Sequence, residues 1–165
     1  MNILSVLSML AAGDAAVSNE IYFILEETIR RIDCSSNAGF ALVYSGVQAA
    51  AAVYPQQRLL VAAAAATSKF LLCSNNNLRY IGVSGLAALA RVSVAAAAKH
   101  QLAVIDCLSD ADETLKHKTL ALLAEVSNPK NIQFVVSNLL QHLRSAADPH
   151  LRATLVARIA SLAER

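Results

Sequence analysis

Apolar residues along the chain recur every three to four positions, within segments separated by short polar corners. This spacing places the apolar side chains on one face of a helix, so it predicts a series of amphipathic helices. Two corners are well marked, because Asn128-Pro129 and Asp148-Pro149 each put a capping residue before a proline whose fixed φ suits a first helical turn. The pattern predicts nine helices: one before Gly13, then 15–32, one ending at Tyr54, 57–72, 78–91, 95–108, one capped by Asp112 and running to Val126, 129–145 and 149–164.

Three of these helices begin alike, with a leucine followed directly by a basic residue: Leu78-Arg79, Leu115-Lys116 and Leu151-Arg152. The spacings between successive pairs are 37 and 36 residues. Apolar residues stand eight and eleven positions after each leucine, on the same helical face: Leu86, Leu123 and Ile159, and Leu89, Val126 and Leu162. A two-helix unit at this interval is close to the roughly 40-residue period of HEAT and armadillo repeats. We therefore predict an all-α fold, an α-solenoid in which each helix pair buries its apolar face against its neighbours. A four-helix bundle is the alternative, but nine segments and a repeat exceed its needs.

The composition agrees with a helical chain. Of the 165 residues, 56% are hydrophobic and 16% charged, and glycine and proline together number only eight. The scarcity of turn residues argues against an all-β fold, and the many large aliphatic residues argue against disorder. No stretch reaches the roughly 18–20 uncharged apolar residues that would span a membrane, and no basic residues precede the apolar N-terminal run as in a signal peptide. We expect a soluble protein whose first helix is truncated.

The residues that could carry chemistry do not form a recognisable site. Cys34, Cys73 and Cys107 are 39 and 34 residues apart, which favours three free thiols in a reducing compartment. The four histidines lack the spacing of a zinc site: His100, His117, His142 and His150. The acidic cluster Asp110, Asp112 and Glu113 stands where a helix begins, so we expect it to cap that helix. We predict no catalytic, cofactor-binding or metal-binding residue, and no cofactor.

Charge excludes one class of partner and leaves one candidate surface. The net charge of +2 is spread along the chain without a basic stripe, which argues against nucleic acid. A basic edge could be formed by Lys116-His117-Lys118 together with Arg79, Lys99 and Arg152, and could meet an acidic partner or an anionic lipid. The other interpretation, which we favour, is that Arg79, Lys116 and Arg152 pack their stems and pair with carboxylates between repeats.

The region 100–143 resembles the trunk of adaptin large subunits. The features that carry the resemblance are Ile105, Cys107 and Leu108 at a helix end, Asp110, Asp112, Leu115 and Lys116 in the next corner, and Asn131-Ile132 further on. Residues 74–89 also fit, and the resemblance extends from about residue 10 to the end of the chain. Within the family the epsilon type is most similar, on the grounds of Asn76–Gly82, Val53-Tyr54-Pro55, Glu26-Glu27 with Arg30-Arg31, and 156–165. The alanine tracts 62–66 and 95–98 depart from the family pattern.

The resemblance implies that residues 1–165 are one α-solenoid segment of a longer N-terminal trunk. Such a trunk is a non-catalytic scaffold in a heterotetramer with a second large, a medium and a small chain. An Arf-type small GTPase would recruit the complex to trans-Golgi or endosomal membranes, where it would sort cargo into vesicles from the cytoplasmic side. The alternatives are a gamma- or alpha-type trunk of a clathrin adaptor, a HEAT-like scaffold from another system, or an enzyme whose active site lies outside this segment.

Overall fold

The computed structural model describes residues 3–32 and 36–164. Within these residues the chain forms ten α-helices and one short 3-10 helix, with no strand. The elements are α1 Ile3–Ala11, α2 Ala15–Arg31, α3 Asn37–Ala52, α4 Gln57–Leu71, α5 Asn76–Ala90, α6 Val94–Ala98, α7 Gln101–Asp106, the 3-10 helix η1 Cys107–Ser109, α8 Glu113–Val126, α9 Ile132–Ser145 and α10 Pro149–Ala163. No helix in the described part of the chain is both long and apolar enough to cross a membrane.

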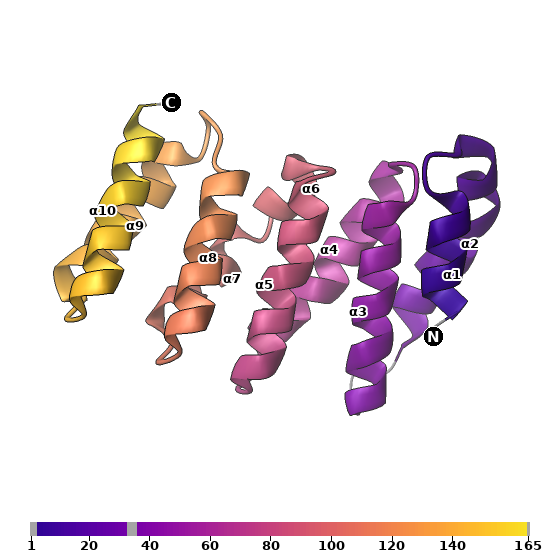
Figure 1. The fold of residues 1–165 in the computed structure, drawn as a ribbon, viewed down its shortest axis with the longest axis horizontal. Coiled ribbons are helices and arrows are strands. Elements are labelled where there is room, and N and C mark those ends of the chain that lie inside the picture. The colour runs from indigo at the N-terminus through magenta and orange to yellow at the C-terminus, as the bar shows by residue number, and fades with distance from the viewer. Residues whose placement is uncertain (1–2, 33–35, 165) are drawn as a thin grey trace.

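The helices stack in two rows along one axis (Figure 1). The first row consists of α1, α3, α5, α8 and α10, each packed on the next, and α2, α4, α7 and α9 lie behind it. The two ends of the chain lie at opposite ends of the stack. Helix pairs that pack mainly on their sequence neighbours define a solenoid, so the predicted fold class is confirmed.

The repeat positions supply the core of this stack. Seven of the nine predicted apolar positions are buried: Leu86, Leu89, Leu115, Leu123, Val126, Leu151 and Leu162. The first leucine of the first repeat, Leu78, and Ile159 of the third are only half-buried. The face that the periodicity identified is therefore the face that neighbouring pairs cover.

Side-chain caps explain where several helices begin. Asp112 accepts a hydrogen bond from the Leu115 N–H at 3.1 Å, and Asp148 accepts one from the Leu151 N–H at 2.6 Å, with Pro149 in the first turn of α10. The predicted starts of α8 and α10 are confirmed. Helix α5 begins at Asn76, slightly before the predicted start, because the Asn75 side chain accepts from the Asn77 N–H.

The predicted helix start at residue 129 is wrong, because α9 begins at Ile132. Asn128 accepts hydrogen bonds from the backbone N–H groups of Lys130 and Asn131, so it closes a separate turn rather than capping the helix. The buried Asn131 side chain fixes that turn, since its amide group donates to the Val126 carbonyl and to the Gln101 side chain. A single asparagine thus joins α7, the end of α8 and the start of α9.

The single helix predicted over 95–108 is also wrong, because the chain forms α6, α7 and η1 there. No proline or glycine causes the break. The His100 N–H donates to the Ala97 carbonyl at 3.0 Å and closes a tight turn after α6. Helix α6 packs mainly on α5 and α4 and also touches α8, whereas α7 packs mainly on α8 and touches α4 less. Tertiary packing in two directions therefore outweighs the helix propensity of the alanine tract.

Two glycines let α4 and α5 approach closely. A Cβ atom on Gly82 would lie 2.8 Å from Leu71 Cδ2, and one on Gly85 would lie 2.8 Å from Thr67 Cγ2. Both distances are shorter than real Cβ contacts allow. The glycines serve helix packing, as their isolation from any phosphate-binding pattern suggests.

Candidate functional site

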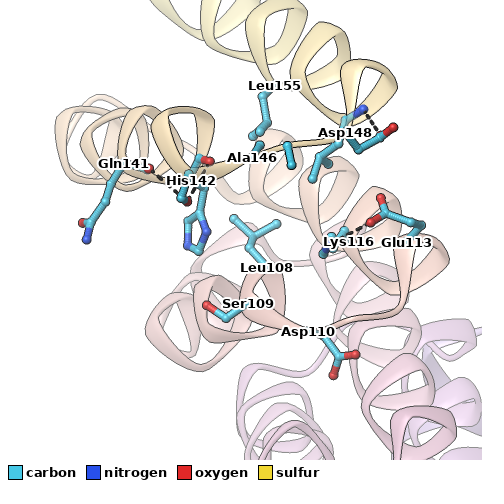
Figure 2. A pocket seen from close by; sticks show the side chains of 13 residues that line it. Leu108, Ser109, Asp110, Glu113, Lys116, Gln141, His142, Ala146, Asp148 and Leu155 are labelled. Atoms are coloured by element: carbon cyan, nitrogen blue, oxygen red, sulfur yellow. Dashed lines mark hydrogen bonds and ion pairs between the residues drawn. The ribbon is translucent and has the colours of Figure 1, made fainter.

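A cavity of about 610 Å³ lies where the corner before α8 faces the corner between α9 and α10 (Figure 2). Leu108, Ser109 and Asp110 line it from the first corner, and α8 contributes Glu113 and Lys116. The second corner and its helices contribute Gln141, His142, Ser145, Ala146, Ala147, Asp148, Leu151 and Leu155. The stacking of successive helix pairs forms the cavity, since its walls come from two repeats.

The Asp110 side chain in this cavity is held by two structural hydrogen-bond partners. One carboxylate oxygen accepts from the Asp112 N–H at 2.9 Å, and the other pairs with Arg79 of α5. The side chain is only 6% exposed. The hydrogen bond from Asp112 first, and then the one from Arg79, hold the pKa of Asp110 below its ordinary value. A carboxylate that stays ionised and already has two donors is not a general acid or base.

The Asp148 side chain also accepts structural hydrogen bonds, at the start of α10. Its hydrogen bond from the Leu151 N–H is the main reason that the pKa of this carboxyl is lowered, and a further bond from the His150 N–H and the nearby His150 and His117 rings act in the same direction. It therefore serves as a cap.

His142 lines the cavity from the last turn of α9. Burial lowers its pKa, which keeps the imidazole neutral near pH 7, although Asp106 opposes this shift. Burial also lowers the pKa of His100, in the turn after α6. A neutral imidazole could bind a metal, but the described residues include no group of three histidine, cysteine or acidic side chains placed to hold one.

The basic residues of the repeat bind within the stack. Arg79 donates to the Leu71 carbonyl at 3.1 Å, and Arg152 donates to the Leu143 and Ala146 carbonyls at 3.0 and 3.1 Å. Each arginine thus reaches the end of the preceding helix, where a cation complements the exposed carbonyl groups.

The two lysines of the candidate basic edge also have partners within the chain. Lys116 pairs with Glu113 of its own helix at 2.8 Å. The Lys118 ammonium lies 5.0 Å from the Tyr80 ring centroid, within cation–π range. His117 is exposed, and Lys99 lies in the turn between α6 and α7. Of the expected pairs with carboxylates between repeats, the described residues show only that of Arg79, because Lys116 pairs within its own helix and Arg152 binds backbone carbonyls.

Two of the three cysteines lie within the described residues. Cys107 is buried, and burial raises the pKa of its thiol. Cys73 is a half-buried free thiol, and Cys34 lies outside the described residues.

The sequence singled out several cavity residues but not the cavity. Asp110, Glu113, Lys116 and His142 stood out by residue type, whereas Gln141 did not. It reaches the cavity only because α9 stacks beside the preceding pair. The polar corners recur in the same phase as the repeat leucines, and this recurrence is the sequence signal that relates the two corners.

Comparisons with known proteins extend this picture. The profile of a family described as "Adaptin N terminal region" matches residues 1–165. The chain is 36% identical to "AP-4 complex subunit epsilon" of Arabidopsis thaliana over all of this chain and 18% of that protein. It is 32% identical to "AP-4 complex subunit epsilon-1" of Homo sapiens over all of this chain and 14% of that protein. Identity to "AP-1 complex subunit gamma-2" of Arabidopsis thaliana is 27%, over all of this chain and 19% of that protein. The chain thus spans less than a fifth of each of these relatives.

Proposed function

Because the chain belongs to the adaptin N-terminal region family, we propose that it is one segment of the solenoid trunk of a large adaptor-complex subunit. The observation that carries the proposal is the family match over residues 1–165, together with identity that is higher to the epsilon chains than to the gamma chain. An epsilon-type trunk follows from that difference. Adaptin trunks are non-catalytic adaptor subunits, and the family membership supports a non-catalytic role for this segment.

The segment belongs to a longer trunk in this proposal. Support comes from the length of the relatives and from the outer face of α1 and α2. Leu10 and Phe23 are 67% and 73% exposed, and large exposed apolar patches mark interaction surfaces. A further helix pair packed against α1 and α2 would bury them, as each pair within the stack does for its neighbour.

The trunk acts as a scaffold in vesicle-mediated protein transport. Its partners are the second large, the medium and the small chain of an adaptor complex, and an Arf-type small GTPase recruits the assembly to trans-Golgi or endosomal membranes. The protein is then cytoplasmic and associates with membranes only through the complex. The commitment of Asp110, Asp148 and Arg79 to caps and ion pairs supports a structural role.

Affinity purification of the full-length protein that contains this segment tests the proposal. We expect medium and small adaptor chains of the AP-4 type to co-purify in a stable complex. Recovery of gamma-type clathrin-adaptor partners would favour the alternative trunk type. A stable protein that carries neither set of chains would overturn the assignment and favour a HEAT-like scaffold from another system.

A further inference from the structure

A second groove, of about 700 Å³, lies in the rear row between the end of α2 and the length of α4. We call it the α2–α4 groove, and its lining residues are Ile29, Arg30, Ile32, Gln57, Arg58, Val61, Ala62, Ala65, Ala66 and Lys69. We infer that it binds an acidic amphipathic helix from a partner protein. This inference goes beyond the assembly role, because it assigns a separate docking surface.

The positive charge on the rim of the groove exceeds the negative charge of the carboxylate beside it, that of Glu26. Arg30 and Arg58 both bind the same oxygen of Glu26, at 2.7 and 2.9 Å. The Glu26 side chain is 11% exposed, whereas those of Arg30 and Arg58 are 54% and 71% exposed. One carboxylate therefore holds two guanidinium groups whose other donors face solvent.

Lys69 adds a further cation at the far end of the groove. It is exposed, and the described residues give it no ion pair. Three cations against Glu26 leave a net charge of +2 along the described rim. Carboxylates on a ligand could pair with the positive charge on the rim that Glu26 does not balance.

The floor of the groove is apolar and shaped for a helix. Ile29, Ile32 and Val61 flank the alanines of α4. The lining positions of α4 run from Gln57 to Lys69, a rise of about 18 Å or three turns. A helix of similar length could place large aliphatic side chains on this floor and carboxylates beside the rim, as in other helix-in-groove complexes. A flat membrane surface would meet the arginines without reaching the floor, so a peptide fits the combination better.

The test uses the full-length protein and a phage-displayed library of random 16-residue peptides. The library is selected on the wild-type protein and counter-selected on a Lys69→Glu, Ala65→Leu double variant. We expect the enriched peptides to combine acidic residues with leucine-like residues three or four positions apart. An absence of enriched peptides, or enrichment of peptides without this pattern, would overturn the inference.

A synthetic copy of the most enriched peptide is then measured by fluorescence anisotropy. Lys69→Glu and Ala65→Leu should each weaken binding at least about fivefold, because one reverses a rim charge and the other fills the groove. Lys130→Glu and Ala157→Leu are matched controls on exposed positions elsewhere, and should change binding less than about twofold. Equal effects of groove and control variants would sink the inference. A Lys69→Glu variant that loses binding to phosphatidylserine vesicles but keeps binding to the peptide would also overturn the inference.

Discussion

Arg79, near the start of α5, pairs with Asp110 in the corner before α8, 31 residues further along the chain. The same arginine donates to the Leu71 carbonyl at the end of α4. One guanidinium group thus links the end of α4, the start of α5 and the corner before α8. The basic residue after the repeat leucine stabilises the junction between helix pairs in this repeat.

Arg79→Ala should lower the free energy of unfolding by about 2 kcal/mol, because it leaves a nearly buried carboxylate without its cation. Urea denaturation followed by circular dichroism measures the change. Glu113→Gln is the control, since it breaks the exposed ion pair with Lys116 and should cost less than about 1 kcal/mol. If the two variants are equally stable, the Arg79–Asp110 pair does not hold the junction.

The cap of α10 should make stability depend on pH. The lowered pKa of Asp148 means that its ionised form stabilises the fold above the ordinary aspartate pKa of about 3.9. This contribution is lost as the pH falls through the lower pKa of the folded state. Asp148→Asn keeps a capping oxygen but removes the charge, so it should destabilise the protein at pH 7 and matter little once the pH is below the lowered pKa of the folded state. Urea unfolding at a series of pH values checks this, and a constant difference between variant and wild type would contradict it.

Gly82→Ala should destabilise the chain, although alanine is the better helix former by about 1 kcal/mol. The new Cβ would meet Leu71 Cδ2 at 2.8 Å, Phe70 Cβ at 3.1 Å and the Leu71 backbone nitrogen at 3.3 Å. Backbone and Cβ atoms cannot rotate away, so α4 and α5 must separate at a cost of about 1–3 kcal/mol. Thermal melting measures the effect, with Ala88→Gly in the same helix as the control for propensity. A Gly82→Ala variant that melts above the wild type would show that the two helices are not closely packed.

Residues 1–165 alone should self-associate through the uncovered face of α1 and α2. Phe23→Asn should reduce light scattering and shift the chain toward a monomer in size-exclusion chromatography, because it removes a large apolar side chain that is 73% exposed. Leu72→Asn is a matched control, at a position that is 78% exposed in the corner after α4. A wild-type segment that is monomeric and melts cooperatively would contradict this prediction.

Reversing the charges of Lys116 and Lys118 to glutamate should leave binding to anionic liposomes and to adaptor partners unchanged. Both lysines already have partners within the chain, Lys116 with Glu113 and Lys118 with the Tyr80 ring. Liposome co-sedimentation and co-purification are the measurements, and Lys130→Glu controls for the change in net charge. A loss of binding specific to the double reversal would restore the basic edge as a functional surface.

The sequence predicts those features that depend on residues close together in the chain. Asp112 and Asp148 cap helices that start within three residues of them, so their local pattern was sufficient. The break at His100 was not predictable in this way, because α6 packs mainly on α5 and α7 mainly on α8. The partner of Arg79 was expected only as a nearby carboxylate. Asp110 becomes that partner because the stacking of pairs places its corner beside α5.

The cavity and the α2–α4 groove could not be predicted from the sequence for the same reason. Ala62 and Ala65 appeared as departures from a family pattern, and only the position of α2 beside α4 makes them the floor of a groove with a cationic rim. Repeat spacing predicts which faces are covered. It does not predict which gaps between neighbouring faces stay open.

The end-to-end stacking of helix pairs has a consequence for how the chain acquires its structure. Within the described residues, the hydrogen bond that joins the most distant positions links Lys118 to Tyr80, only 38 residues apart. Closing short loops costs little entropy, and proteins dominated by such local contacts fold quickly. Each pair can therefore fold onto the preceding one as it leaves the ribosome, without waiting for the rest of the polypeptide to be synthesised.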